Sequence, residues 1–259
     1  MNSRERVVKA MNFGQPDRVP LMCQFSIGFM LKQLKVSPAE FWFDGKVFLD
    51  GLIELKNIFK FDGILVSLHG HDTEWRKQVE KIEKQDSGEK VFWKNGDITF
   101  CPNLELPMHY PKNPKLVSDI NSIDPDSIPE DVVNIPVSQG LYFDLSYGNL
   151  VSILNDAFTK TGGQVSIHGE ITSPFDYFLD LVGHESSLMA LIDEPDKCKA
   201  ILQRYTDAIK KLALVMCGQN IDAIKILAPY AGAGFISPKF YEEFVLPYET
   251  QIATATREK

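Results

Sequence analysis

The fold is decided by the stretch Ile221–Pro238, which has the sequence IDAIKILAPYAGAGFISP. The apolar run around Ile224 predicts a buried strand. Pro229 ends that strand, because proline has no backbone N–H to donate to a sheet ladder.

A glycine-containing loop and a helix start follow this strand. Gly232 and Gly234 are expected to take positive φ or to let the backbone come close to a ligand. Ser237 suits a helix N-cap, and Pro238 suits the first helical position. Strand, loop and helix make one β–α unit, and in parallel α/β folds the chemistry lies at the edge where strands enter such loops.

Three further apolar segments predict strands near residues 20, 65 and 166, each followed by a helical pattern. With the strand near 225, this is the β–α order of a parallel sheet. A closed TIM barrel has eight strands. We therefore expect an α/β fold of the TIM (β/α)8-barrel type, here a partial barrel of about four parallel strands. It would form a single domain over residues 1–259 that is incomplete at its C-terminal side.

Residues 73–114 interrupt this alternation. Val91–Trp93 and Ile98–Cys101 flank a segment that contains Asn95-Gly96, a pair typical of tight hairpin turns. We expect a β-hairpin insertion within the domain. Residues 111–140 are rich in Pro, Asp, Asn and Ser and predict a connecting segment with short helical turns.

Composition limits the class of function. The net charge of −8 argues against a nucleic-acid or anionic-membrane partner. No apolar run approaches the roughly 20 residues that span a bilayer, and the N-terminus lacks the apolar core of a signal peptide, which favours a cytoplasmic location. Cysteines 23, 101, 198 and 217 form no C-x-x-C pair and are expected to be buried apolar thiols.

Polar residues cluster where the predicted strands end. His69, His71 and Asp72 follow the second strand, and His168 and Glu170 end the third. The two histidines could line a substrate cavity, or they could bind a metal with Asp72 orienting one ring. We favour substrate contact by His71, His168 and Glu170, with no metal, although structural capping by His168 or Glu170 stays open.

Two residues near these ends also have alternative interpretations. Tyr230 could stack on a flat ligand or simply pack, and we count it with Gly232 among the substrate-binding candidates. Asp176 opens a helix, where a carboxylate favours the positive end of the helix dipole.

Several segments together resemble the uroporphyrinogen decarboxylase superfamily: Ser3–Met11 with Pro16–Pro20, Gly169–Phe175, and Ile236–Tyr248. The resemblance implies a (β/α)8 barrel with its active site at the C-terminal strand ends. It also implies one of two chemistries. One branch decarboxylates the acetate groups of uroporphyrinogen without a cofactor, and the other comprises zinc-dependent enzymes that move a methyl group between a corrinoid and a thiol.

The residues match the decarboxylase branch poorly. Its Arg-rich stretch after strand one corresponds to Met22–Met30, which contains no Arg and has Gln24 as its polar substrate-binding candidate. Its central Asp corresponds to His69, or to Asp72 if the alignment shifts, and its Ser after strand four corresponds to Ala231.

Two other positions match better. The family's Tyr after strand three corresponds to Tyr177, and Arg18 lies in the N-terminal signature. The resemblance thus implies catalytic roles for Tyr177, His69 and Asp72. It implies substrate binding by Gln24 and Ala231, and its position makes Arg18 a substrate-binding candidate, although a structural pairing of Arg18 near the first turn of the barrel is favoured.

The methyltransferase branch is preferred. The zinc ligands that the resemblance implies lie beyond Lys259, so we expect no cofactor in this chain, with zinc and a corrinoid belonging to a full-length relative. The expected partner is a small-molecule, tetrapyrrole or corrinoid ligand, together with a second copy or a completing segment, since an open half-barrel exposes a sheet edge. The alternatives are uroporphyrinogen decarboxylation and a non-catalytic, partner-completed fragment, and we expect the chain alone to be inactive.

Overall fold

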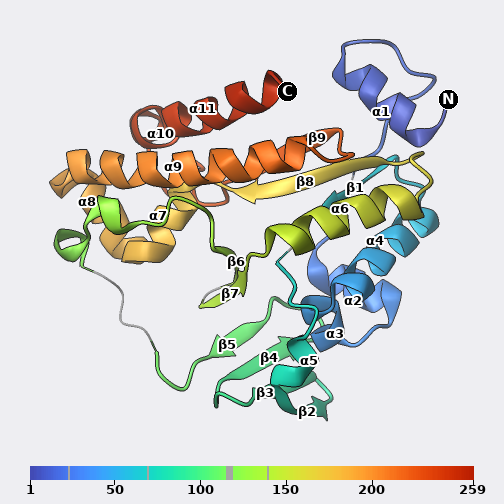
Figure 1. Cartoon of the computed structure of the whole chain (residues 1–259), viewed down its shortest axis with the longest axis horizontal. Coiled ribbons are helices and arrows are strands. Elements are labelled where there is room, and N and C mark those ends of the chain that lie inside the picture. Colours follow the sequence, from blue (N-terminus) through green and yellow to red (C-terminus); the bar gives the residue numbers. More distant parts are fainter. Residues whose placement is uncertain (23, 69, 115–118, 139) are drawn as a thin grey trace. The chain divides into compact units, whose positions relative to one another are not determined.

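The computed structural model describes residues 1–22, 24–68, 70–114, 119–138 and 140–259 (Figure 1). The chain forms two compact units, which are described separately. The first unit comprises residues 1–114, 134–169 and 219–223, and the second comprises residues 115–133, 170–218 and 224–259. Strands β8 and β9 contribute residues to both units.

The parallel sheet has the strand order β1-β8-β9, with β1 at Gly63–Val66, β8 at Ser166–Thr172 and β9 at Ala223–Leu227. Strand β1 pairs with β8 in parallel, from Gly63 opposite Ser166 to Val66 opposite Gly169. Between β8 and β9, Asp222 N–H donates to the Ile167 carbonyl and Ser173 N–H donates to the Leu227 carbonyl. The residue numbers of the bonded partners increase together along β8 and β9, as they do in a parallel pair. The expected α/β fold with a parallel sheet is confirmed.

The strand expected near residue 20 is not formed by the described residues there. Residues 19–22 belong to no strand, and one backbone bond, from Asp62 N–H to the Leu21 carbonyl, joins this segment to the start of β1. Pro20 supplies no N–H for a ladder, so the segment runs extended beside the sheet without regular pairing.

The helices of the first unit are α1 (Ser3–Met11), α2 (Ile27–Leu34), α3 (Pro38–Phe43), α4 (Gly45–Phe59), α5 (Trp75–Gln78) and α6 (Tyr147–Lys160). Four of these six helices, α1, α3, α4 and α6, begin at a residue whose side chain caps them. Asn2 and Glu5 form a capping box on α1, and the Ser37 hydroxyl accepts from Glu40 N–H at the start of α3. These caps satisfy amide groups that the first helical turn leaves without partners.

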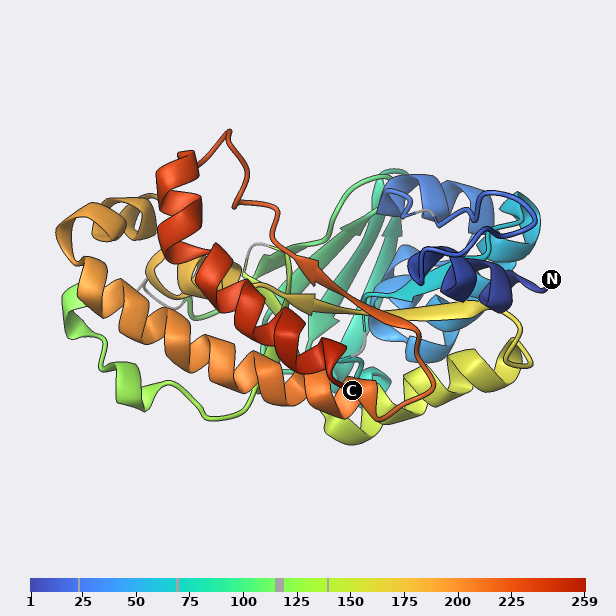
Figure 2. The ribbon, with the colours of Figure 1, turned by 90° about the horizontal axis from the view of Figure 1, so that it is seen from above.

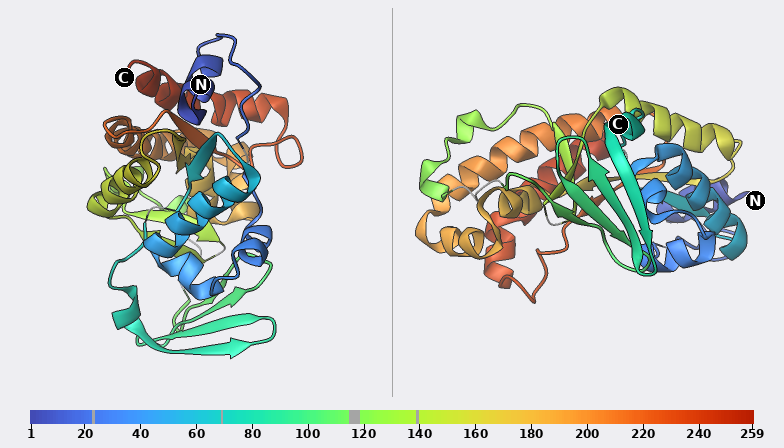
Figure 3. Two further views of the ribbon diagram at one scale, coloured as in Figure 1. Left: turned by 90° about the vertical axis from the view of Figure 1, so that its right-hand side faces the viewer. Right: turned by 90° about the horizontal axis from the view of Figure 1, so that it is seen from below.

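A four-stranded antiparallel sheet follows α5 in the first unit (Figure 3). Its strands are β2 (Val79–Gln85), β3 (Gly88–Trp93), β4 (Ile98–Pro102) and β5 (Met108–Tyr110). The predicted hairpin is its β3–β4 pair, with Gly96 at φ 92° in the turn. The outer strands β2 and β5 were not predicted, and neither was the separate hairpin of β6 (Asn134–Ser138) and β7 (Leu141–Asp144).

The second unit is largely helical, with α7 (Pro174–Val182), α8 (His184–Asp193), α9 (Pro195–Cys217), α10 (Pro238–Phe244) and α11 (Leu246–Arg257). The expected short turns are the 3₁₀ segments η1 (Ile120–Ser122) and η2 (Pro125–Ser127). Helix α11 packs against α9 (Figure 2). The helical segment that begins at Pro238 is divided into α10 and α11 at Val245, two residues before Pro247 in the first turn of α11.

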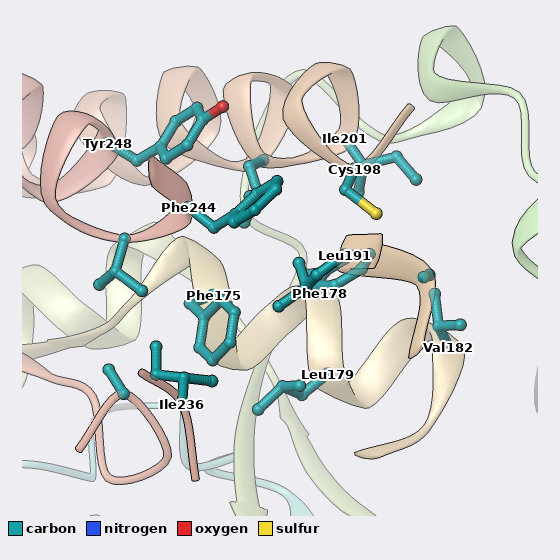
Figure 4. Close-up of a cluster of buried hydrophobic side chains, with 14 of the residues drawn as sticks. Phe175, Phe178, Leu179, Val182, Leu191, Cys198, Ile201, Ile236, Phe244 and Tyr248 are labelled. Carbon is teal, nitrogen blue, oxygen red and sulfur yellow. The ribbon is translucent and has the colours of Figure 1, made fainter. Parts of the chain in front are cut away.

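Aromatic rings fill the core of the second unit. Phe175 and Phe178 from α7 and Phe244 from α10 are almost fully buried, and Cys198 of α9 lies among them (Figure 4). Burial raises the pKa of the Cys198 thiol to about 12, and that of Cys101 likewise to about 12. Both are the buried apolar thiols that were expected, whereas Cys217 is half-buried and Cys23 lies outside the described residues.

No helix within the described ranges combines the length and apolarity that a membrane span requires.

The fully buried carboxylate of Asp62, immediately before β1, holds the N-terminal segment of the first unit. It accepts from Arg6 at 2.6 Å, from both terminal nitrogens of Arg18 at 2.8 Å, and from Leu21 N–H at 2.8 Å. Burial alone would raise the pKa of Asp62, but the Leu21 amide and the two guanidinium groups outweigh it and hold the pKa below its usual range.

Asp62→Asn is therefore expected to lower the free energy of unfolding by about 1–3 kcal/mol, because it removes the buried charge to which Arg6, Arg18 and the Leu21 amide donate, while Arg6 keeps its second partner, Asp17. Urea unfolding at pH 7 measures the change. The exposed Asp86→Asn in the β2–β3 turn is the control, expected to change stability by about 0.5 kcal/mol or less. Because the native pKa of Asp62 is depressed, its contribution should disappear as the pH falls below about 4. Equal effects of the two variants would contradict this role.

Candidate functional site

A pocket of about 360 Å³ lies alongside β1 in the first unit. Leu65 and Ser67 come from β1 and the residues after it, and Leu52 and Leu55 come from α4. The segment that enters α2 and the segment after β4 complete the lining, with Gln24, Phe25, Ser26, Ile27, Gly28, Met30, Phe61, Gly63, Ile64, Leu104, Glu105 and Leu106. A pocket of this size accommodates a small molecule.

The pocket walls are mostly apolar, and the described residues that line them include no cation. Its polar side chains are Gln24, Ser26, Ser67 and Glu105, and Glu105 is the one charged group among the lining residues. A multiply charged anion would lose its hydration here without gaining a cationic partner, which is costly. The pocket therefore suits a neutral or weakly polar molecule.

Close packing fixes one wall of this pocket. A side-chain carbon added at Gly28 would lie 2.0 Å from the carbonyl oxygen of Leu104. The start of α2 thus touches the backbone of the 104–106 segment directly, which only glycine permits. Leu104 and Leu106 themselves are 60% and 51% exposed, so this wall lies at the surface.

Of the predicted site residues in the first unit, Gln24 lines the pocket, whereas Arg18 binds Asp62 as described above. His71 is buried and packs between the rings of Phe48 and Phe143. Asp72 is exposed, accepts from Glu74 N–H and Gln78 Nε2, and shapes the turn before α5. His69 lies outside the described residues, so its predicted role remains a prediction.

His168 lies on β8 opposite Leu65 and belongs to a chain of polar groups. Arg4 Nε donates to Asp222 Oδ1 at 2.8 Å, Ser166 Oγ donates to Asp222 Oδ2 at 2.9 Å, and Ser166 Oγ lies 3.1 Å from His168 Nε2. Burial lowers the pKa of His168, and the negative charge of Asp222 opposes that effect only in part. His168 is therefore neutral at pH 7, and its Nε2 is linked through Ser166 to Asp222 and Arg4.

In the second unit, Glu170 ends β8 and accepts from Lys225 Nζ of β9 at 2.8 Å. Glu170 is 7% exposed, so water screens its carboxylate little and the ion pair with Lys225 compensates the buried charge. Tyr177 is buried and stacks on Tyr205 with ring centres 5.3 Å apart. These contacts pack Tyr177 against α9, and its predicted catalytic role remains a prediction.

The loop after β9 carries the other candidates. Tyr230 contacts the rings of His184 and Phe235, and Ala231 is buried in the core of the second unit. The expectation of positive φ at Gly232 and Gly234 is wrong, since neither has it. A side-chain carbon at either glycine would meet nothing within 4 Å, so the backbone there is open to approach.

Asp176 was not among the predicted site residues, yet it is the most perturbed carboxyl of the second unit among the described residues. It is 5% exposed, and neither oxygen has a hydrogen-bond partner of ordinary geometry there. Burial, followed by the charges of Asp180 and Glu249, raises the pKa of Asp176 to about 7. The sequence signal was two acids four residues apart, Asp176 and Asp180, on an otherwise apolar helix.

The family described as uroporphyrinogen decarboxylase (URO-D) matches residues 126–259, about half of the chain. The chain belongs to this URO-D family. It is 27% identical over 129 residues to uroporphyrinogen decarboxylase of Corynebacterium glutamicum (strain R), a match that covers 48% of this chain and 34% of the relative. The decarboxylase of Gloeobacter violaceus is 27% identical over 113 residues, covering 41% of this chain and 32% of the relative. The chain thus spans about a third of the length of these curated relatives.

The fold of this URO-D family chain is similar to that of a solved methyltransferase from Methanosarcina mazei. The TM-score is 0.66 at 15% identity, and the match covers 99% of this chain and 67% of that chain. At this identity the likeness concerns the fold alone. The expected family membership is confirmed by the family match.

Zinc, which the methyltransferase branch implies, has no fitting ligand set within the described part of the chain. No group of three or more His, Cys, Asp or Glu side chains is placed there to hold a metal ion. His71 and Asp72 do not converge, because the ring of His71 is held among aromatic side chains and Asp72 faces the turn before α5. No chemical step is derived through zinc.

The perturbed Asp176 predicts a pH-dependent stability. Its folded pKa of about 7 lies above its unfolded value of 3.8, so the folded state binds more protons between those values and stability falls as the pH rises. Asp176→Asn should remove this cost. We expect the variant to gain on the wild type progressively from about pH 4 to pH 7, by roughly 2–4 kcal/mol at the plateau.

Chemical unfolding at pH 4, 5.5 and 8 measures this difference. The exposed Asp193→Asn on α8 is the matched control and should follow the wild type at each pH. A gain by Asp176→Asn that is equal at all three pH values would contradict a raised pKa.

Proposed function

We propose that this URO-D family chain serves a small-molecule methyltransferase that uses a corrinoid as methyl donor or acceptor. The observation that carries the proposal is the charge of the pocket beside β1: the described residues of its lining include no Lys, Arg or His, and Glu105 is the one charged side chain among them. A substrate with eight carboxylates requires cationic partners. A neutral methyl acceptor does not.

If the proposal holds, the apolar and the polar residues of the pocket have different roles. Phe25, Ile27 and Leu55 exclude water from the bound molecule, while Gln24 and Ser67 orient it through hydrogen bonds. At about 360 Å³ the pocket lies near the lower limit of the volumes found for small-molecule sites. This volume suits the small methyl acceptor or donor, and it is too small for a corrin ring. The corrinoid, when bound, supplies or accepts the methyl group from outside this pocket.

In this proposal the parallel sheet forms part of a (β/α)8 barrel, and a completing segment or a second copy of the chain provides the remaining wall. Strand β9 supports this idea, because it is an edge strand of the sheet and all five of its residues are half-buried. Exposed strand edges tend to pair with further strands.

Uroporphyrinogen decarboxylation is the second candidate, since the curated relatives described above carry that name. The two candidates make opposite predictions. The full-length protein, with the remaining barrel wall present, is expected to consume methylcobalamin in the presence of a small alkyl thiol, which the change in cobalamin absorbance measures. It is expected to release no CO₂ from uroporphyrinogen. Release of CO₂ at an ordinary enzymatic rate would overturn the preference.

Pocket binding gives a test that requires no turnover. Ser67→Leu inserts bulk into the pocket and should weaken binding of a small neutral thiol by about tenfold or more, as measured by ligand-observed NMR. The exposed Ser186→Leu on α8, which does not line the pocket, should bind like the wild type. Tight binding of uroporphyrin by the wild type, equally lost in Ser67→Leu, would favour decarboxylation instead.

A further inference from the structure

A second pocket, of about 470 Å³, lies at the amino-terminal edge of the parallel sheet in the first unit. The start of α1, the last turns of α4 and α6, and the segment that enters β8 line it, and these elements meet on one side of the unit (Figure 1). Val165, a lining residue, directly precedes β8. Among the described residues, this amino-edge pocket shares no lining residue with the pocket alongside β1.

The charged side chains that line the amino-edge pocket are cationic. They are Arg6, Lys56 and Lys160, and the described residues of the lining include no Asp or Glu. This is the reverse of the pocket alongside β1, where Glu105 is the one charged side chain among the described lining residues. It is also the reverse of the whole chain, in which 35 acidic residues outnumber 27 basic ones. A concave surface that carries one sign of charge concentrates small ions of the opposite sign.

The guanidinium of Arg6 is already compensated. It donates to Asp17 through Nε and Nη2, and to Asp62 through Nη1. Arg6 is 7% exposed, so these bonds hold it rigidly in the wall of the pocket. The two lysines are therefore the cations that a ligand can engage.

The lysines are only weakly committed to protein partners. Lys56 forms no ion pair within the described part of the chain, and its hydrogen bond there is a 3.5 Å contact with Asn57 Oδ1. Lys160 pairs with Asp50, but both side chains are at least a third exposed. Exposed pairs of this kind contribute little free energy, so Lys160 can exchange Asp50 for a bound anion at small cost.

The start of α1 adds polarity of the same sign. Asn2, the N-cap, and Ser3, the first helical residue, both line the pocket. The N-terminal end of a helix carries a partial positive charge. The side-chain amides of Asn57 and Gln164 add neutral hydrogen-bond donors to the lining.

Helix termination explains each lysine by itself. Lys56 and Lys160 lie in the last turns of α4 and α6, where a cation offsets the negative end of the helix dipole. That role does not require two helix ends to share one pocket with the start of a third helix and with no acidic residue in its described lining. A bound anion accounts for this combination.

We infer that the amino-edge pocket binds a small oxyanion of the class formed by inorganic phosphate and phosphate monoesters. Lys56 and Lys160 are its cationic partners. The bound anion links α1 to α4 and α6, and it therefore stabilises the folded first unit by mass action. This inference goes beyond the proposed function and does not rest on it, because the two pockets have no described lining residue in common.

Titration with inorganic phosphate at pH 7 tests the inference, with sodium chloride adjusted to keep the ionic strength constant. In ¹H–¹⁵N spectra the amide resonances of Ser3, Lys56 and Gln164 should shift and reach saturation. Glycerol 2-phosphate, titrated in the same way, shows whether an ester is accepted as well as the free ion. Saturable binding of either compound at these residues supports the assignment, and saturable binding of neither overturns it.

Variants of exposed side chains separate the pocket from the general charge of the protein. Lys56→Gln and Lys160→Gln should each weaken phosphate binding about fivefold, as expected for the loss of one partly exposed charge pair. Asp50→Asn, which releases Lys160, should tighten it about twofold. Lys46→Gln, an exposed site on α4 that does not line the pocket, is the matched control and should bind like the wild type. Equal weakening by Lys46→Gln and Lys56→Gln would overturn the inference.

Discussion

The burial of carboxylates directly before parallel strands is the constraint on which the first unit depends. Asp62 precedes β1 and is fully buried, and Asp222 precedes β9 with its side chain 6% exposed. A buried carboxylate is stable only if cations and amide donors surround it. Helix α1 supplies both cations, with Arg6 on Asp62 and Arg4 on Asp222. The N-terminal helix is therefore bound to the amino-terminal edge of the sheet through charge.

This ionic edge contrasts with the pocket alongside β1. The arginines of the N-terminal segment are engaged near Asp62 and Asp222, and no cation occurs among the described residues of the pocket lining. Arg18, which the family resemblance made a substrate candidate, binds Asp62 with both terminal nitrogens. The same contacts that hold the segment in place thus keep its positive charge away from the pocket.

Sequence similarity and site chemistry favour different activities. The curated relatives are decarboxylases at 27% identity over about half of this chain, while the solved methyltransferase shares the fold at 15% identity. Neither match specifies a substrate, so the character of the pocket carries more weight in the proposal. An apolar pocket whose described lining carries Glu105 as its one charged side chain favours a small neutral molecule over a polyanion.

Local signals in the sequence determined the β–α units, the caps at Ser37 and Ser237, and the β3–β4 turn, because each depends on residues adjacent in the chain. Family membership also followed from short motifs. Partners far apart in sequence were decided only by the tertiary structure. It buried His71 among aromatic rings, joined Asp222 to Ser166, and desolvated Asp176, which local sequence had suggested as an ordinary helix-start acid. Burial and long-range pairing set the charge and tautomer of a side chain, and neither is visible in its neighbours along the chain.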